Sequence, residues 1–376
     1  MKTYAQIIGW GKYLPPKILT NHDLEQMVDT SDEWIRTRSG ISERHIAGPK
    51  ETTATMATKA AQAAIEVADI SPSKIDLILV ATVTPDTQYP ATACRVQDAI
   101  GASHAGAIDI STGCPGWLYG LSLANGMICS GMLRTVLVIG AETMSRALDW
   151  TDRSTCVLFG DGAGAVVLQA TQEPTGLLSF VLGSDGSGAD LLQQPAGGSK
   201  MPASIETVQN RMHTVHMNGN EVYKFAVSIM GKATLQAVKA ADLTVDQIDL
   251  FVPHQANIRI IDYAAKQLKL PPEKVFVNVD HVGNTSSASI AIALCEAIEQ
   301  GRVKPGDYIA MVSFGAGLSW AAVTMQWGVS PVVAPMPFWK TAIHNLRGRE
   351  AAVRSIAKRT ARRIGSIRKL NGQSES

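Results

Sequence analysis

The sequence predicts an α/β protein made of two similar, layered halves, because buried strands alternate with alanine-rich helices and the same order of elements occurs twice. Short apolar runs rich in Val and Ile, typical of buried strands, cover 75–85, 134–142 and 162–170. Alanine-rich segments at 53–70 and 118–131 carry apolar residues at helical spacing. Alternation of this kind favours helices packed in layers on sheets.

The second half of the chain repeats the first. Its matched segments are IDLILVATVTP (75) with IDLFVPHQAN (248), VLVIGAE (136) with IAMVSFGAG (309), and GCPG (113) with GNTSS (283). The three offsets are 173, 173 and 170 residues, and the last pair opens a helix in each half. Three ordered matches at nearly one offset indicate a duplication.

The duplication predicts the division of the chain. We expect halves at 1–172 and 173–328, followed by a linker and basic extension at 329–376. A duplicated fold packs its halves about a pseudo-twofold axis, so equivalent elements meet near the centre. Cys114 and Asn284, which begin equivalent segments, are therefore expected to face each other across that axis.

Composition narrows the class of protein. With 45% hydrophobic and 18% charged residues among 376, the chain is typical of a folded globular protein. It has no run of about 18 uncharged apolar residues, so no membrane span is expected. The scattered cysteines are Cys94, Cys114, Cys129, Cys156 and Cys295. Their spacing argues against a disulfide framework or a metal site and favours the reducing cytoplasm; nucleic acid is not an expected partner.

The end of the chain differs in charge from the rest. Residues 340–376 carry ten Lys and Arg against two Glu, whereas the remaining chain is acidic overall. Within 349–370, apolar residues recur at near-helical spacing and basic residues crowd the other face. Such a helix suits an anionic membrane surface. An acidic partner, the acidic body of the protein itself or a merely solvated tail are the alternatives.

Cys114 is the candidate nucleophile. It lies in STGCPGWLYGL, where a strand at 107–110 gives way to a helix. Gly113 permits a tight turn, and Pro115 suits the first helical position. Free N–H groups and the helix dipole favour an anion there, which predicts a reactive thiolate. The alternative is a buried structural cysteine.

His254, Asn284 and a glycine-rich turn are further candidates. His254 ends the buried run in FVPHQANIRI, at the end of a strand, where α/β sheets present active sites. Asn284 in HVGNTSSASIAIAL is either a site residue or a helix cap. The turn in SFGAGLSW (313–320) offers backbone N–H groups that would complete an oxyanion hole with the amide of Cys114. A structural role for His254 is the alternative.

Five motifs carry a family resemblance: DTSDEWIRTRSGISERHIAG (29–48), TDRSTCVLFGDGAGAVVL (151–168), MNGNEVYKFAV (217–227), VPHQAN (252–257) and GNTSSAS (283–289). In these the chain resembles the β-ketoacyl-acyl-carrier-protein synthase III family, over roughly its first 327 residues. The resemblance implies the thiolase fold with αβαβα layering, a homodimer and no cofactor. It also implies decarboxylative condensation of an acyl-CoA primer with malonyl-acyl-carrier protein, the start of fatty acid synthesis.

The resemblance also implies roles for single residues. Cys114 would hold the acyl group as a thioester, while His254 and Asn284 would bind the malonyl thioester carbonyl. The backbone of Cys114 and Ala316 would form the oxyanion hole. The implied binding residues are Trp34, Arg38, Arg153, Asn220 and Asn257 for CoA; Lys224, Gln255 and Arg259 for the carrier protein; and Tyr89, from the partner subunit, and Trp117 for the acyl pocket.

The chain departs from the family pattern around the nucleophile. It has G-C-P-G-W where the family usually has A-C-A/S-G-F, Ala316 replaces a glycine, and residues 328–376 extend beyond the usual end. The resemblance therefore does not imply an acyl preference. Other functions considered are an acyltransferase or condensing enzyme of secondary metabolism with the same site, a hydroxymethylglutaryl-type synthase using Glu142 as base, and a non-catalytic module built on the tail.

Overall fold

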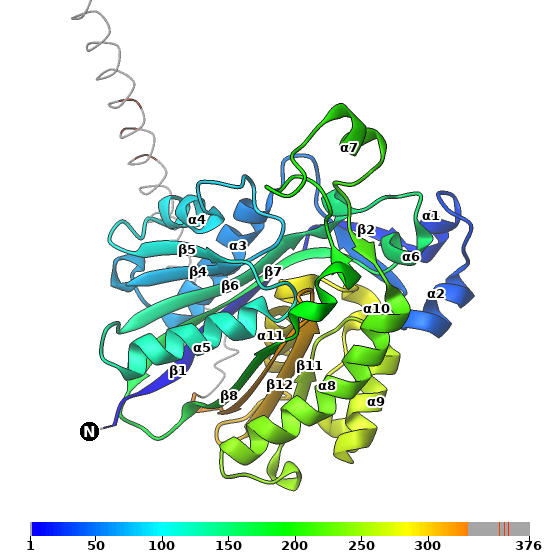
Figure 1. Ribbon diagram of the computed structural model, residues 1–376. Helices are drawn as coiled ribbons and strands as arrows, with labels where there is room; N and C mark the ends of the chain where they lie inside the picture. The colour runs from blue at the N-terminus through cyan, green and yellow to red at the C-terminus, as the bar shows by residue number, and fades with distance from the viewer. Residues whose placement is uncertain (1, 330–352, 354–356, 358–359, 361–376) are drawn as a thin grey trace, which may run out of the picture.

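The computed structural model describes residues 2–329 together with Val353, Ala357 and Thr360. Two sheets separated by helices form the body at 2–329, and further helices cover the outer faces (Figure 1). The basic segment predicted at 349–370 lies outside the described residues, apart from those three, and its membrane contact stays a prediction.

The first sheet has the strand order β1-β7-β6-β4-β5. Its strands are β1 (Tyr4–Tyr13), β7 (Asp161–Thr171), β6 (Thr135–Thr143), β4 (Leu77–Ala81) and β5 (Gly106–Ile110). β5, β4 and β6 are parallel, and β7 is antiparallel to both β6 and β1. β6 is buried along its whole length, which explains its continuous apolar run.

The second sheet repeats this arrangement with one strand fewer. Its order is β11-β12-β13-β8, with β11 (Leu250–Pro253), β12 (Tyr308–Gly315), β13 (Ser319–Gln326) and β8 (Gly176–Ser184). β11 is parallel to β12, and β13 is antiparallel to both of its neighbours.

Strand register confirms the duplication. Leu77 of β4 pairs with Val136 of β6, and Leu250 of β11 pairs with Ile309 of β12. Each residue of the second pair lies 173 positions after its counterpart in the first pair. The predicted α/β class with duplicated halves is therefore correct. The boundaries proposed at 172/173 and 328/329 stay predictions.

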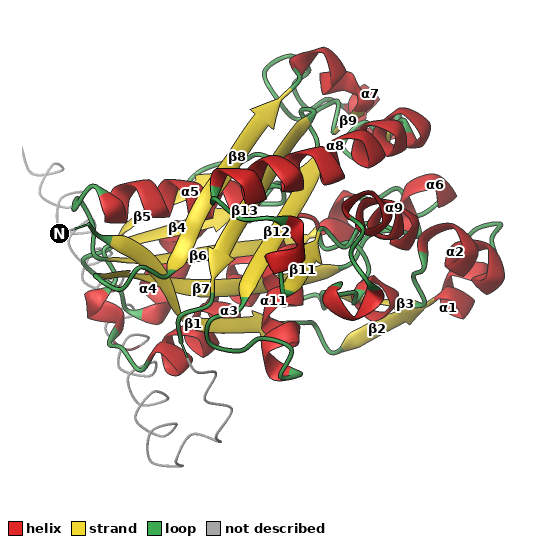
Figure 2. Ribbon diagram, turned by 90° about the horizontal axis from the view of Figure 1, so that it is seen from below, coloured by secondary structure: helices red, strands yellow, loops and turns green. Residues whose placement is uncertain are grey.

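Helices fill three layers around the sheets (Figures 1 and 2). The long helices are α3 (Thr53–Ala68), α4 (Thr92–Ile100), α5 (Gly116–Cys129), α8 (Gly219–Ala240), α9 (Ile258–Leu268) and α11 (Ser289–Glu299). α5 and α11 lie between the sheets, α3 and α4 cover the outer face of the first sheet, and α8 with α9 cover the second. The alternation read from the sequence thus gives the predicted αβαβα layering.

Shorter elements surround the layers. They are β2 (Lys17–Thr20), α1 (Asn21–Glu25), α2 (Asp32–Ser39), β3 (Glu43–Ile46), α6 (Arg153–Cys156), β9 (Leu192–Gln193), α7 (Ile205–Gln209), β10 (His216–Met217) and α10 (Val279–Val282). α7 projects from the body at the top of Figure 1. Among the described residues, none of the helices combines the length and apolarity needed to cross a bilayer.

Candidate active site

Cys114 lies two residues before α5, in the turn that follows β5. Gly113 has φ +65°, a left-handed conformation that glycine adopts without strain. Pro115 is the N-cap residue of α5. The Cys114 thiol donates a hydrogen bond to Ser286 Oγ, with 3.7 Å between sulfur and oxygen. The nucleophile predicted from the first half therefore contacts the turn that carries Asn284.

The electrostatic setting of Cys114 differs from the expectation. The residue keeps some accessible surface. Protein atoms nevertheless surround the sulfur so densely that burial raises the pKa of the Cys114 thiol to about 12, with a smaller raising effect from the Glu142 carboxylate. The hydrogen bond to Ser286 acts in the lowering direction. With a pKa this high, the resting thiol is protonated at neutral pH.

His254 follows β11 and is completely buried. Burial lowers the pKa of its imidazole to about 3, so the ring is neutral at physiological pH. Its Nδ1 lies 3.0 Å from Ser289 Oγ, which also accepts a 2.8 Å hydrogen bond from the backbone N–H of Gln255. Its Nε2 has no hydrogen-bond partner among the described residues. A buried nitrogen without a partner is a candidate for a hydrogen bond to a bound substrate.

Asn284 precedes the short helical turn Ser286–Ala288 that leads into α11. Its backbone is fixed against 158–160, where its N–H donates to Leu158 O at 2.9 Å and its C=O accepts from Gly160 N–H at 3.0 Å. Its side-chain oxygen accepts from Ser286 N–H at 2.9 Å. This bond holds the carboxamide with its oxygen occupied, which orients its NH₂ group as the donor.

The three predicted residues converge on one segment, 284–289. Cys114 contacts Ser286, His254 contacts Ser289, and Asn284 belongs to the segment. The run of hydroxyl residues in NTSSAS is the sequence signal for these contacts. A nucleophilic thiol beside two neutral hydrogen-bond donors can form a thioester and stabilise an enolate.

The glycine-rich turn after β12 lies directly against the nucleophile. A Cβ added to Gly315 would lie 2.9 Å from Cys114 N, and one added to Gly113 would lie 3.2 Å from Ala316 N. Side chains at these positions would force the two segments apart. The backbones of Cys114 and Ala316 are thus adjacent, as an oxyanion hole made from both requires.

Trp34, Arg38 and Arg153 form a cluster at the surface. The Cζ atoms of Arg38 and Arg153 lie 5.0 and 5.1 Å from the Trp34 ring centroid, within cation–π range. Arg153 Nη1 also donates to Asp29 O at 2.7 Å. The structure therefore brings together three residues that the sequence assigned to CoA.

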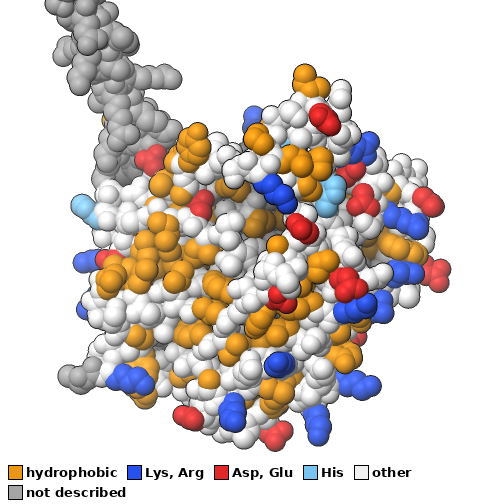
Figure 3. All heavy atoms as spheres, viewed as in Figure 1, with side chains coloured by type: hydrophobic (Ala, Val, Ile, Leu, Met, Phe, Trp, Pro, Cys, Tyr) orange, Lys and Arg blue, Asp and Glu red, His pale blue; other side chains and the backbone are white. Residues whose placement is uncertain are grey.

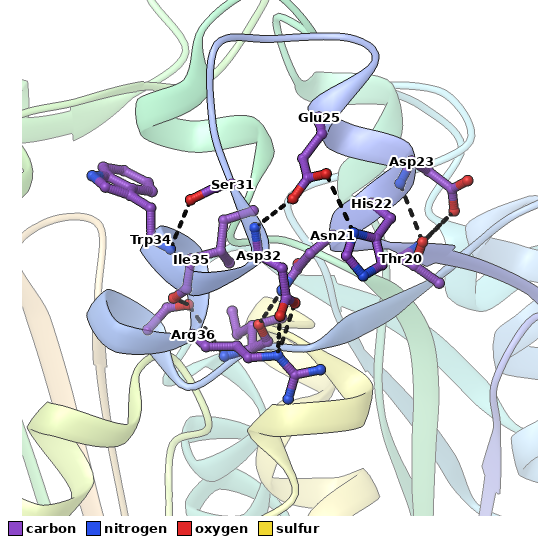
Figure 4. Close-up of polar contacts among 12 residues, drawn as sticks. Thr20, Asn21, His22, Asp23, Glu25, Ser31, Asp32, Trp34, Ile35 and Arg36 are labelled. Atoms are coloured by element: carbon purple, nitrogen blue, oxygen red, sulfur yellow. Dashed lines mark hydrogen bonds and ion pairs between the residues drawn. The ribbon is translucent and has the colours of Figure 1, made fainter.

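Polar contacts hold α2, which carries Trp34 (Figure 4). Ser31 Oγ accepts from Trp34 N–H at 3.1 Å and caps the helix. Asp32 accepts from Arg36 Nε and from Asn21 Nδ2, both at 2.8 Å. Figure 4 shows the indole pointing away from these contacts, so the ring is presented by a fixed helix.

Asn220 lines a cavity of about 850 Å³ beside the start of α8. Asp149, Arg211 and His216 also line it, and Arg211 Nη1 bonds Asp149 at 2.8 Å. That ion pair holds the pKa of Asp149 at about 2. Asn257, by contrast, uses its side chain internally: Nδ2 donates to Arg38 O at 2.9 Å, and Oδ1 caps α9.

Gln255 contradicts its predicted role in docking a carrier protein. It is 1% exposed. Its Nε2 donates to Pro253 O and Phe276 O, and its Oε1 accepts from the N–H groups of Asn278 and Val279. A buried amide with all its hydrogen bonds made within the protein cannot contact a protein partner, so the assignment is wrong.

The other assigned residues differ in accessibility. Lys224 and Arg259 are exposed, with Lys224 bonded to Glu221 at 2.7 Å. Tyr89 is 84% exposed. Trp117 is packed between the sheets, where its indole N–H donates to Val138 O at 3.3 Å.

Glu142 is not open to substrate, although its residue type suggested a general base. It lies at the end of β6 and is completely buried. Thr82, Val83 and Thr84 donate to its carboxylate from one side, and the hydroxyls of Ser286 and Ser287 donate from the other. Burial raises its pKa despite these donors.

Comparison with known proteins identifies the family. Models of 3-oxoacyl-[acyl-carrier-protein] synthase III match residues 108–186, and models of its C-terminal part match 238–327. The chain is 58% identical over 322 residues to β-ketoacyl-[acyl-carrier-protein] synthase III of Symbiobacterium thermophilum, covering 86% of this chain and 98% of the relative. The relative of the same name from Caldanaerobacter subterraneus is 55% identical, with 87% and 98% covered.

A solved structure agrees with the sequence matches. The crystal structure of 3-oxoacyl-[acyl-carrier-protein] synthase III from Aquifex aeolicus aligns with a TM-score of 0.79 at 47% identity, covering 86% of this chain and 99% of that one. Sequence and fold therefore agree over about 86% of the chain. The chain belongs to the β-ketoacyl-[acyl-carrier-protein] synthase III family.

Proposed function

We propose that this chain condenses an acyl-CoA primer with malonyl-acyl-carrier protein in the cytoplasm, releasing carbon dioxide and starting fatty acid synthesis. The observation that carries the proposal is the convergence of Cys114, His254 and Asn284 on the segment 284–289. The reaction uses no cofactor, because acyl-CoA is itself a substrate.

In the first half-reaction, Cys114 Sγ attacks the thioester carbon of acyl-CoA and CoA leaves. Negative charge develops on the carbonyl oxygen in the tetrahedral intermediate. The backbones of Cys114 and Ala316 are adjacent, which supports a role for their N–H groups as the oxyanion hole. The product is an acyl group held on Cys114.

In the second half-reaction, His254 and Asn284 act on malonyl-acyl-carrier protein. Loss of carbon dioxide places negative charge on the thioester oxygen, and His254 Nε2–H with the Asn284 NH₂ group stabilises it. Fixed donors in a site closed to water are effective here, each contributing about 10²–10³ in rate. The resulting carbanion attacks the acyl group on Cys114 and forms the new carbon–carbon bond.

Ser289 sets the tautomer of His254. Its Oγ accepts from Gln255 N–H and lies 3.0 Å from His254 Nδ1, and we assign the Ser289 hydroxyl as the donor in this second contact. Nδ1 then accepts, so the imidazole proton resides on Nε2, where the reaction needs a donor. Ser289 is therefore a positioning residue.

The binding surfaces have the chemistry of the two substrates. Trp34 with Arg38 and Arg153 offers an aromatic face and positive charge to the nucleotide end of CoA. Lys224 and Arg259 are exposed cations suited to an acidic carrier protein.

We further propose a homodimer through β5. This strand is at the edge of its sheet and presents unpaired backbone groups. Figure 3 shows hydrophobic side chains gathered over β5 and α5, and Ile108 and Leu123 on these elements are exposed. Tyr89 is exposed beyond the same sheet. A second copy of the chain would cover this surface and receive Tyr89.

Reconstitution tests the proposed function. We combine the full-length protein with acetyl-CoA and malonyl-acyl-carrier protein, and measure the mass of the carrier protein by mass spectrometry. We expect the mass of the acetoacetyl adduct with the wild type and none with Cys114→Ala, because the acyl group then has no nucleophile. An unchanged yield with Cys114→Ala would contradict the proposal.

A further inference from the structure

Glu142 is a buried carboxylate to which the proposed mechanism gives no task. Its Oε2 is occupied by donors of the 82–84 segment, including Thr84 Oγ1 at 2.5 Å. Its Oε1 accepts from Ser286 Oγ at 3.2 Å, from Ser287 Oγ at 2.8 Å and from Val83 N–H at 3.2 Å. Burying a charged group costs free energy. A carboxylate separated from the nucleophile by a single side chain, that of Ser286, therefore requires an explanation.

Hydrogen bonds join Cys114 to Glu142 in one direction. Cys114 Sγ–H donates to Ser286 Oγ, and the Ser286 hydroxyl donates to Glu142 Oε1. Each donor in this chain points toward the carboxylate. Ser287 also reaches Glu142, but it has a second acceptor, Ala81 O at 2.7 Å, and the described residues include no hydrogen bond between Ser287 and Cys114.

Backbone geometry keeps Ser286 in this bridging place. Its φ is +49°, a conformation that side-chain-bearing residues rarely adopt. Gly140 of β6 makes room for the turn, since a Cβ there would lie 2.3 Å from Ser287 O. The segment 286–288 can therefore approach the end of β6 closely enough for both serines to reach Glu142.

We propose that Ser286 relays the thiol proton of Cys114 to Glu142, which stores it while the enzyme is acylated. The proposal rests on Cys114 being the nucleophile and adds the base for its deprotonation. The thiol requires one because burial keeps its pKa near 12, where little thiolate exists at neutral pH. His254 is unsuited to the task, since its low pKa leaves it a poor proton acceptor.

Protons and electrons balance over the cycle. During acylation the thiol proton passes to Ser286 Oγ as the serine proton passes to Glu142 Oε1, while Sγ forms the thioester bond. The bond from the acyl carbon to CoA breaks, and the CoA thiolate takes a proton from solvent. During condensation the expelled Cys114 thiolate recovers its proton by the reverse path. One solvent proton is consumed per cycle, as decarboxylation of the malonyl carboxylate requires.

The pH dependence of acylation tests the relay. Full-length protein is mixed with acetyl-CoA from pH 6 to pH 9, quenched rapidly, and the Cys114 adduct is quantified by intact mass. In the wild type we expect a rate that is independent of pH once Glu142 is ionised. Ser286→Ala should acylate about 10²-fold more slowly at pH 7, with a rate that rises tenfold per pH unit because free thiolate must now form.

Ser287→Ala is the matched control, since it removes a hydroxyl bound to the same carboxylate oxygen without touching the thiol. It should keep the pH-independent profile, whereas Glu142→Gln should follow Ser286→Ala. Difference infrared spectra should also gain a protonated-carboxyl stretch on acylation of the wild type, but not of Ser286→Ala.

The possible outcomes distinguish a failure of the proton relay from a failure of the proposed condensing function. A Ser286→Ala rate equal to the wild type, or lower by one constant factor at every pH, overturns the relay while leaving Cys114 as the nucleophile. Absence of any adduct on Cys114 in the wild type would instead overturn the proposed function.

Discussion

His254 is a neutral hydrogen-bond donor because of where its ring is buried. No solvent reaches it, its pKa is about 3, and Ser289 occupies Nδ1. A protonated imidazole would be a stronger donor but would cost a large desolvation energy in this place. Neutral donors suit a reaction in which charge appears on the substrate oxygen only in the transition state.

The contact between Ser289 and His254 predicts how removal of the Ser289 hydroxyl affects the two half-reactions. Ser289→Ala should lower the rate of condensation by up to about 10²-fold, the typical loss for one misdirected donor. Acylation of Cys114 should be nearly unaffected, because His254 has no part in that step. Single-turnover measurement of both half-reactions checks this, and equal losses in both would contradict a role in setting the tautomer.

The sequence predicted the helices and strands more accurately than it predicted the burial and contacts of individual side chains. The matched registers of β4 with β6 and β11 with β12 follow from apolar runs, since burial of a strand is encoded in its own residues. The burial of Gln255 depends on Phe276 and Asn278, more than twenty residues away. The high thiol pKa of Cys114 likewise comes from packing by distant segments, which no local pattern displays.

At the scale of elements, β5 joins the site to the proposed dimer. The strand ends at Ile110, four residues before Cys114, so movement of β5 would displace the nucleophile. Pairing of this edge with a second copy would fix its position. The same pairing would bring Tyr89 of one subunit toward the partner.

Ile108→Asp tests the dimer proposed through β5. Because this side chain is exposed in the single chain, the substitution should spare folding, while a carboxylate in an apolar interface should weaken association. We expect sedimentation equilibrium to give a dimer for the wild type and mainly monomer for the variant. An exposed control, Leu235→Asp on α8, should remain dimeric. Dimers of undiminished stability in Ile108→Asp would exclude β5 as the interface.

At the scale of the whole molecule, an ionic cluster joins the two halves. Lys12 of β1 contacts Glu296 of α11 at 3.3 Å, and His281 of α10 contacts the same carboxylate at 3.2 Å. Asp280 and Glu296 raise the pKa of His281 to about 10 from an ordinary 6.5. Folding is therefore coupled to protonation of this histidine.

The His281 cluster predicts how stability depends on pH. A folded-state pKa above the unfolded value means that the contribution is complete below pH 6.5 and is lost as pH rises through about 10. Since the side chain is 41% exposed, solvent screening limits the loss to on the order of 1 kcal/mol, or about 2 °C in Tm. Thermal unfolding from pH 6 to pH 10 checks this, and His281→Gln should remove that part of the decline. An identical decline in His281→Gln would refute the assignment.

In the proposed mechanism, Cys114 carries the acyl group while Asn284 acts only on the malonyl substrate. The most direct measurement is intact-mass analysis of the enzyme after mixing with acetyl-CoA and malonyl-acyl-carrier protein together. We expect Asn284→Ala to accumulate one acetyl group on Cys114, because condensation can no longer discharge it, whereas the wild type turns over and Cys114→Ala stays unmodified. An adduct on Cys114→Ala, or an Asn284→Ala enzyme that cannot be acylated, would contradict this division of roles.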